Sequence, residues 1–341
     1  MLCAALAVPL FVGCGSDPAP STTMTMTDGG TRPPPRECPP GPNVCACADM
    51  GPPDFSGATS GMPSETSDMG QMQALERTNY WRTAAGLTAI NLNAQLEQAA
   101  VAHSTFMAMN PSSCYSGAHN EVQGGCTGFT GASPGARIIA AGYRPAAAGE
   151  VINWNSSVNS SIDGWIWTVY HRTPFQDPGY TEAGFGSVRG GGRLNNTMDF
   201  ARPSGASAGA LTDVSVFPPP GTTYVPAAFQ GNLEGPTPPV PRSTRAWPSG
   251  QVISLMFPSD AFTIESHHLY DGSCTDVVHS TFIAAGATVA DAAVDANNHN
   301  RRFVFLYADR RLNANTQYTV EIRGTRDGAP WSRVWAFTTS P

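Results

Sequence analysis

The sequence predicts a multidomain chain: a disordered N-terminal tether, a domain of mixed helices and strands, and a C-terminal all-β sandwich. Three observations support this order. A short apolar start leads into a stretch rich in Pro, Gly, Ser and Thr, the middle of the chain carries capped helical segments, and the last third has short β-rich runs. At 341 residues the chain is long enough for two domains with cores of their own.

The distribution of charge along the chain argues against a nucleic-acid partner. The chain carries 19 basic and 26 acidic residues, a net charge of -7, and no region is strongly basic. Nucleic acids and anionic lipid surfaces attract basic patches. We therefore expect no nucleic-acid partner.

Residues 1–13 are interpreted as an export signal, because they are apolar but too short to span a bilayer as a stable anchor. They end in Gly13-Cys14, with aliphatic residues ahead of the glycine, which resembles a lipobox. This resemblance implies that Cys14 bears lipid and anchors an exported lipoprotein at the outer membrane or cell surface. The alternative is an ordinary cleaved signal, a secreted protein and a free Cys14 thiol.

Residues 14–67 form the predicted tether, because they lack apolar periodicity and cannot bury enough surface to fold. Cys38, Cys45 and Cys47 fall inside it without a histidine or fourth cysteine nearby, so disulfides are favoured over a metal site. Their pairing, and that of Cys274, is left open by the sequence.

The mixed domain, residues 68–203, begins with two predicted helices. Asp68 can cap the first, which runs to Thr83, and Asn91 can cap the second. His103 lies on the apolar face of the second helix, and we interpret it as a buried histidine with one hydrogen bond to the core rather than as a ligand.

A loop that presents His119 follows these helices. Cys114 and Cys126 bracket this loop, and we expect them to form a disulfide. Closing a loop of this size stabilises a protein by about 3 kcal/mol and would restrict the direction of His119.

Two further helices are punctuated by cap signals. Ser133-Pro134 predicts the start of a short helix that ends at Gly142. A second helix is predicted from Ser161 to Arg172, where Pro174 stops it. On that helix Thr168 and His171 would share one face, a turn apart.

Three strands complete this domain. They are predicted over Gly149–Trp154, Tyr180–Val188 and Leu194–Phe200, with Gly190–Gly192 as a hairpin turn between the last two.

Six motifs in this domain occur in the order of a known family: His119, Gly131-x-Ser133-Pro134-x-x-Arg137, Gly142-Tyr143, Gly149-Glu150, Trp165-x-x-Thr168 and His171-Arg172. This order resembles the bacterial branch of the CAP superfamily, the SCP-like or cysteine-rich secretory, pathogenesis-related domain. The resemblance implies an α-β-α sandwich around a small, largely antiparallel sheet.

The family's groove holds two histidines and two acids, and this chain keeps only part of that set. By the resemblance, His119 matches the first histidine and Glu150 the first acid, whereas Thr168 stands at the second acid and Asn195 near the second histidine. The incomplete set implies no required cofactor. Zinc is a further candidate, with His119 and His171 as ligands.

The predicted groove comprises His119, Glu121, Glu150, Thr168, His171 and Asn195. We favour the binding of a lipid or another small envelope component there, without catalysis. The first alternative is a hydrolase in which His119 is the general base beside Glu150, although no nucleophile-elbow motif accompanies it. The second alternative is a purely structural envelope protein whose groove is closed.

Residues 211–341 contain the β-rich runs, among them Val252–Phe257, Phe262–Tyr270, Phe303–Tyr307, Gln317–Arg323 and Val334–Thr339. No amphipathic helix separates them. The opening Phe217-Pro218-x-x-Gly221…Val225-Pro226 and the ending Leu312…Thr316-x-Tyr318-Thr-Val…Trp335-x-Phe337-Thr-Thr resemble a bacterial Ig-like domain. We expect a spacer or adhesive module. His267 and His268 would point to opposite faces of a strand, so they form no ready metal pair.

Overall fold

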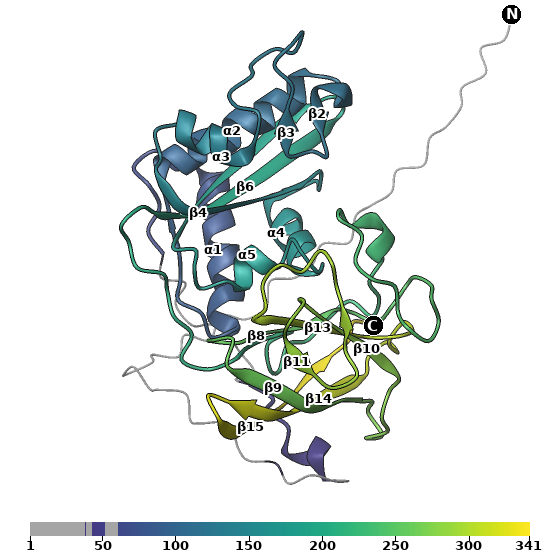
Figure 1. Cartoon of the computed structure of the whole chain (residues 1–341). Helices are drawn as coiled ribbons and strands as arrows, with labels where there is room; N and C mark the ends of the chain where they lie inside the picture. Colours follow the sequence, from purple (N-terminus) through teal and green to yellow (C-terminus); the bar gives the residue numbers. More distant parts are fainter. Residues whose placement is uncertain (1–37, 39–42, 52–60) are drawn as a thin grey trace, which may run out of the picture. The chain divides into compact units, whose positions relative to one another are not determined.

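The computed structural model describes residues 38, 43–51 and 61–341, and these described residues belong to one compact unit. Figure 1 follows the chain from its helical part into its β-rich part. The predicted export signal and the anchor residue Cys14 lie outside the described residues. Among those described, no helix has the length and apolar character that a membrane crossing needs.

The first four α-helices begin at side chains that satisfy free backbone N–H groups. Asp68 caps the first with a capping box to Gln71, and Ser133 caps the third, as predicted. The second is capped by Asn93 rather than Asn91, because Asn91 belongs to a short strand. The helices are α1 (Met69–Ala84), α2 (Ala94–Met109), α3 (Pro134–Ala140), α4 (Val158–Ile166) and α5 (Thr173–Gln176).

A four-stranded sheet in the order β1-β5-β6-β4 forms the middle layer of the helical part. Only β1 pairs in parallel; the others are antiparallel. Helices α2 and α3 cover one face, and α1, α4 and α5 cover the other (Figure 1). The strands are β1 (Asn91–Leu92), β4 (Pro145–Asn153), β5 (Glu182–Gly190) and β6 (Arg193–Pro203).

Helix α2 approaches this sheet so closely that β5 needs glycine. A Cβ atom on Gly184 would lie 2.1 Å from the carbonyl carbon of Leu96 in α2. The tight turn between β5 and β6 is formed by Gly191 and Gly192, both with positive φ, as the predicted hairpin requires.

The predicted helix from Ser161 to Arg172 is wrong in its second half. Helix α4 ends at Ile166, and a turn leads to α5. Thr168 and His171 therefore do not share a helical face, and the basis for placing them in one groove is lost.

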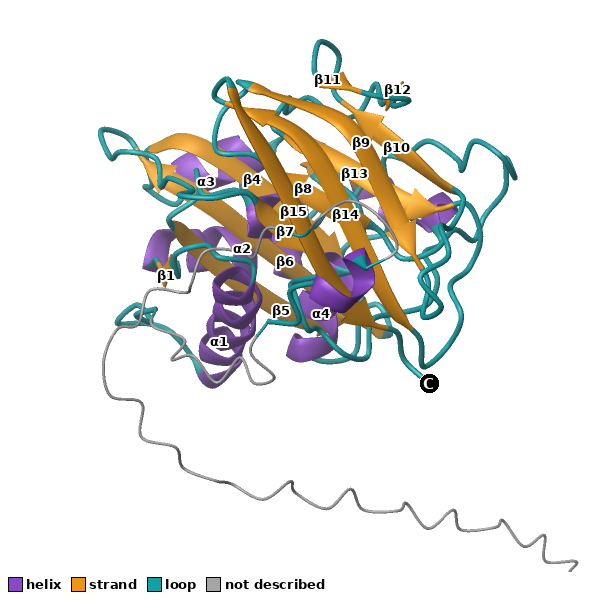
Figure 2. Cartoon of the chain, turned by 90° about the horizontal axis from the view of Figure 1, so that it is seen from below, coloured by secondary structure: helices purple, strands orange, loops and turns teal. Residues whose placement is uncertain are grey.

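The C-terminal region folds into two sheets with a common core (Figure 2). One has the order β12-β10-β13-β8-β7 and the other β11-β9-β14-β15. This bears out a β-rich C-terminal region, whereas the Ig-like topology stays a prediction. The strands are β7 (Ser215–Phe217), β8 (Ile253–Met256), β9 (Phe262–Tyr270), β10 (His279–Ile283), β11 (Thr288–Val289), β12 (Ala293–Val294), β13 (Phe303–Ala308), β14 (Gln317–Arg326) and β15 (Ala329–Thr338).

Part of the predicted tether is folded onto this region. Residues 43–51 include a short 3₁₀ helix, Val44–Cys47, and Asp49 bridges in parallel to Trp335 on β15. Disulfides join Cys38 to Cys47 and Cys45 to Cys274. These disulfides give the cysteine pairing that the sequence left open. They also explain how residues 43–51, which have few apolar side chains, are held in a defined structure.

Candidate functional site

His119 is presented by a short hairpin loop between β2 (Tyr115–Ser116) and β3 (Asn120–Glu121). Its Nδ1 lies 2.8 Å from Oε1 of Glu150, which β4 places beneath the loop. The His119 side chain is 34% exposed and that of Glu150 only 1%. A carboxylate accepts from an N–H, so Nδ1 carries the proton in neutral His119 and leaves Nε2 as an acceptor.

Arg137 of α3 ties both groups together. Its Nη2 donates to Oε2 of Glu150 at 2.5 Å, and its Nη1 donates to the backbone carbonyl of His119 at 2.9 Å. Burial works against the charge on Glu150, but the hydrogen bond from His119 and the charge of Arg137 outweigh it and hold the pKa of Glu150 below its usual value. Glu150 is therefore an anion in the folded protein at neutral pH.

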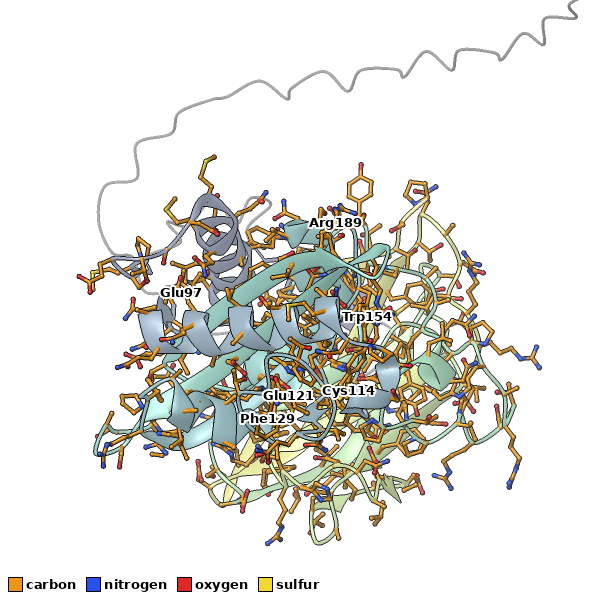
Figure 3. The ribbon with its side chains drawn as sticks, turned by 90° about the horizontal axis from the view of Figure 1, so that it is seen from above. Glu97, Cys114, Glu121, Phe129, Trp154 and Arg189 are labelled. Carbon is orange, nitrogen blue, oxygen red and sulfur yellow. A yellow bond between two sulfur atoms is a disulfide. The ribbon has the colours of Figure 1, made fainter. Side chains whose placement is uncertain are left out.

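A second histidine and acid lie directly behind this pair. Nδ1 of buried His103 is 2.8 Å from Oε1 of Glu121, and its Nε2 is 2.9 Å from the carbonyl of Ala118. Glu121 also accepts from the backbone N–H of Thr130 at 2.8 Å. Although burial opposes it, these donors and nearby Arg137 lower the pKa of Glu121. Both ends of the loop are thereby fixed, and Figure 3 shows Glu121 beside Cys114 and Phe129, below α2.

The predicted disulfide between Cys114 and Cys126 is present, with an S–S distance of 2.04 Å. It closes the segment that carries His119. Together with His103 and Glu121 it restricts the position of the loop.

Asp199 is a third acid of the cluster, and it has no donor. It stands opposite Glu150 in the antiparallel pairing of β4 and β6, and it is 1% exposed. Neither carboxyl oxygen has a hydrogen-bond partner among the described residues. Burial and the charge of Glu150 raise its pKa well above the usual value, so Asp199 holds a proton while Glu150 does not.

We expect Asp199→Asn to stabilise the protein at neutral and alkaline pH by more than about 1 kcal/mol, because folding no longer has to protonate a buried acid and each pKa unit of difference costs about 1.4 kcal/mol. The folded pKa of Asp199 is raised, so its contribution to stability is complete below the unfolded pKa of about 4 and is lost as pH rises. The gain should therefore vanish near pH 4. Urea unfolding of both proteins from pH 4 to 8 checks this, and a gain that is independent of pH would contradict the protonation of Asp199.

The other predicted groove residues are not brought into this cluster. The hydroxyl of Thr168 donates to the carbonyl of Trp165. Nδ1 of His171 is 3.1 Å from Glu234, which belongs to the C-terminal region. The amide of Asn195 donates to the carbonyls of Val188 and Gly190 at the β5–β6 turn.

The residues do not fit the metal site that two histidines and an acid suggested. His119 contacts Glu150, whereas His171 contacts Glu234. In the described part of the chain no three His, Cys, Asp or Glu side chains converge on one metal position. No chemical step is therefore assigned to a metal.

Sequence reasoning missed three members of the cluster. His103 was interpreted as a core histidine with a single hydrogen bond, but it makes two and positions Glu121. Arg137 was used only as part of a motif. Asp199 had no local signal, because its position opposite Glu150 comes from the pairing of β4 with β6.

Comparison with known proteins identifies the family of one segment of the chain. Residues 75–200 match the CAP family, described as the cysteine-rich secretory protein family, and this segment is a CAP domain. The family resemblance in the sequence is thus confirmed. No curated protein sequence matches the chain.

Two solved structures are similar to part of this chain. One is an extracellular protein containing a SCP domain from Bacillus anthracis str. Ames, at 22% identity and a TM-score of 0.32, covering 39% of this chain and 40% of that one. The other is venom allergen-like protein 4 of Schistosoma mansoni, at 10% identity and a TM-score of 0.28, covering 40% of this chain and 91% of that one. This chain thus spans less than half of the Bacillus protein.

Proposed function

We propose that this chain is an exported bacterial envelope protein whose CAP domain binds a ligand at His119 without transforming it. The observation that carries this proposal is the exposure of one polar side chain, His119, above a buried and fully charged support of Glu150 and Arg137. A preorganised polar atom at a surface is what a binding site needs to fix the orientation of its ligand.

The surroundings of His119 favour binding over catalysis. The hydroxyl of Thr130 donates to Glu121, and that of buried Ser104 donates to the carbonyl of Gly186, so neither is aimed at His119 as a nucleophile. The remaining acids support other side chains or hold a proton. The polar network therefore positions one histidine.

The ligand that we propose is a lipid or another envelope component with an apolar portion. Val122, exposed by 42%, follows β3, three residues after His119 in the chain. Met109, exposed by 52%, ends α2, and its methyl group lies near Gly128. Exposed apolar side chains on segments that flank the His119 loop suit a ligand with an apolar portion.

Export and attachment complete the proposal. Three disulfides within the described residues fit an oxidising compartment. Cys14 is the proposed lipid anchor, which would place the protein at the outer membrane or the cell surface. The β-rich region, proposed as Ig-like, then acts as a spacer or adhesive module.

The substitution His119→Asn tests the binding proposal. Asparagine can still donate to Glu150 from the position of Nδ1 but lacks an acceptor at the position of Nε2. We expect the lipid that co-purifies from the native envelope to fall at least tenfold, as measured by mass spectrometry, with unfolding free energy unchanged within about 1 kcal/mol.

The matched control is His268→Asn, which changes a 38%-exposed histidine that also contacts an acid, Asp276. It should retain the ligand. Equal ligand content in wild type and His119→Asn would contradict the proposal.

A hydrolase remains the second candidate, because Nε2 of His119 makes no hydrogen bond to the described residues and could accept a proton from water. A panel of ester and peptide substrates distinguishes the two functions. Turnover that falls by about 10²–10⁴-fold in His119→Asn would favour this candidate.

A further inference from the structure

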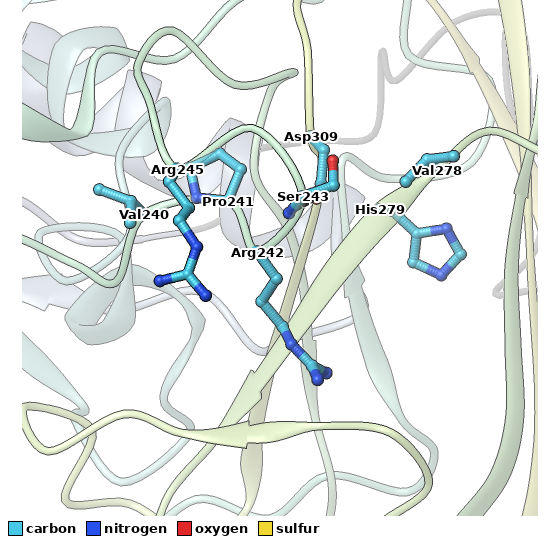
Figure 4. Close-up of a pocket in the computed structure, with 8 residues that line it drawn as sticks. All are labelled: Val240, Pro241, Arg242, Ser243, Arg245, Val278, His279 and Asp309. Carbon is cyan, nitrogen blue, oxygen red and sulfur yellow. Dashed lines mark hydrogen bonds between the residues drawn. The ribbon is translucent and has the colours of Figure 1, made fainter.

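A pocket in the C-terminal region, far from His119 in the sequence, is surrounded by cationic groups. It has a volume of about 490 Å³ and lies between the turn that carries Arg242 and Arg245 and the start of β10 at His279 (Figure 4). This volume is within the range of small-molecule sites. Both arginine side chains extend to the same side of the turn in the close-up.

The arginines of this pocket are not neutralised. Both are exposed, and neither forms an ion pair with a described residue. Among the residues that the structure describes, the guanidinium group of Arg242 donates to one backbone carbonyl, that of Asp291. Arg310 and Arg311, also exposed, follow directly after the pocket residue Asp309. In a chain of net charge -7, this concentration of positive charge stands out.

Asp309 is an acid of the pocket, but it is engaged in holding the turn. It is 3% exposed, its Oδ2 accepts from the backbone N–H of Ser243 at 2.7 Å, and its Oδ1 accepts from the hydroxyl of Ser280 at 2.5 Å. The Ser280 hydroxyl in turn accepts from the backbone N–H of Arg242 at 2.8 Å. The turn is thus fixed before any ligand arrives, which lowers the cost of ordering on binding.

Two histidines in mutual contact, His267 and His279, lie beside the arginines, and His279 lines the pocket. His279 Nδ1 lies 2.7 Å from the carbonyl of Val277, and His267 Nε2 lies 2.9 Å from the carbonyl of Ala290, so both nitrogens must carry protons. The facing nitrogens, His267 Nδ1 and His279 Nε2, are 2.8 Å apart. A proton shared between them would put three protons on the two imidazole rings and give the pair one positive charge.

The surroundings of this pair determine when it is charged. Burial lowers the pKa of His267, as do the neighbouring His279 and His268, while Asp291 and the carbonyl of Ala290 raise it. His268 itself contacts Asp276, and Thr281 lies 3.5 Å from His267. An anion held next to His279 would favour the protonated pair.

We propose that this pocket binds a tetrahedral oxyanion, the phosphate or sulfate group of a small molecule or polymer, through Arg242, Arg245 and the hydroxyl of Ser243, with the His267–His279 pair adding positive charge to the pocket wall when it is protonated. Guanidinium groups bind phosphate oxygens in bidentate pairs, and two of them with a hydroxyl can engage three or more oxygens of one such group. The volume beyond the oxyanion leaves room for the molecule that carries it. This inference does not depend on the His119 site.

Calorimetric titration of the full chain with inorganic phosphate, at low salt, tests the proposal. We expect saturable binding that is at least tenfold weaker in the double variant Arg242→Gln/Arg245→Gln. The control is the double variant Arg144→Gln/Arg189→Gln, which removes the same two charges from exposed positions outside the pocket. No binding by the wild type, or equal weakening in the control, would overturn the site.

Two further titrations sharpen the result. Titrations with glycerol phosphate and a glycerol phosphodiester show whether the bound oxyanion belongs to a larger molecule. Tighter binding than that of inorganic phosphate indicates a phosphorylated molecule, and equal binding indicates the free ion. Either result supports the site.

The pH dependence tests the histidine pair. Sulfate keeps its charge between pH 5.5 and 8, so any change in its affinity reports protonation of the protein alone. We expect affinity to rise at least threefold toward pH 5.5 in the wild type and not in His279→Gln, and the same rise in that variant would remove the histidine pair from the site.

Discussion

Replacing Arg137 with alanine is expected to cost about 3–5 kcal/mol of unfolding free energy, the typical penalty for leaving a buried charge without its partner. Arg137 is 1% exposed, donates to Glu150 at 2.5 Å and lies 3.8 Å from Glu121. Without Arg137, the carboxylates of Glu121 and Glu150 would be buried with no cation between them. Protonated Asp199 cannot replace that cation. The substitution also releases the carbonyl of His119, so His119 should lose its orientation.

The pH dependence distinguishes this mechanism from a simple loss of packing. The pKa values of Glu121 and Glu150 are lowered in the folded protein, so the stability that they contribute is present above their unfolded values and lost as pH falls. The deficit of Arg137→Ala, measured by urea unfolding, should therefore shrink from pH 7 to pH 4. Arg326→Ala is the control, because its ion pair with Asp213 is partly exposed and worth about 0–1 kcal/mol. A deficit that is constant with pH would refute the electrostatic account.

Elements with local signals could be predicted from the sequence. The capping box of Asp68, the cap at Ser133 and the glycines of the β5–β6 turn are each decided by neighbouring residues, and the structure has them where expected. The disulfide at Cys114 was predicted for the same reason. Asn91 was a misplaced cap because two asparagines, two residues apart, offer the same chemistry, and pairing with β5 takes the first into a strand.

The end of helix α4 could not be predicted, because a distant residue decides it. The carboxylate of Glu234 accepts from the backbone N–H groups of Val169, Tyr170 and His171 at 2.9, 2.6 and 3.3 Å. Those N–H groups would otherwise bond within a helix. Since Glu234 lies more than sixty residues away, no local pattern around Thr168 reveals the break, and His171 was assigned to the wrong surroundings.

Only part of the His119 cluster could be predicted from the sequence, because distant residues decide the rest here too. His119 and Glu150 were identified by their motif, whereas the importance of Asp199 comes from a cross-strand register that fixes it opposite Glu150. Register depends on the whole sheet. A list of polar residues therefore could not separate Asp199, which has no donor, from a solvated surface acid.

The segment 168–172, which the sequence analysis assigned to a groove, instead joins the CAP domain to the β-rich region. His171 and the preceding backbone bind Glu234, and Tyr170 donates to Asp295 at 2.7 Å. One apolar core contains Trp81 and Trp165 from the helical part and Phe305 and Tyr307 from β13. We therefore expect the two regions to unfold together.

Arg172→Ala should destabilise both regions by about 3–5 kcal/mol, the range for cavities and orphaned polar groups in a core. Arg172 is fully buried, donates to the carbonyls of Ile166 and Val252 at 2.6 and 3.0 Å, and stacks on Phe217 at 4.4 Å. Burial lowers its pKa to about 9, yet it stays charged at neutral pH.

Native-state hydrogen exchange provides the decisive measurement for this variant. Amides of α2, in the helical part, and of β13, in the β-rich part, should lose the same free energy of protection, since the carbonyls of Ile166 and Val252 lie one on each side of the junction. Arg202→Ala is the matched control: Arg202 also donates to backbone carbonyls, those of Gly179 and Ala206, but both lie on its own side. Arg202→Ala should therefore lower the free energy of protection in β13 less than Arg172→Ala does. If Arg172→Ala lowered protection in α2 and left β13 unchanged, the two regions would be independent folding units and the junction only a contact between them.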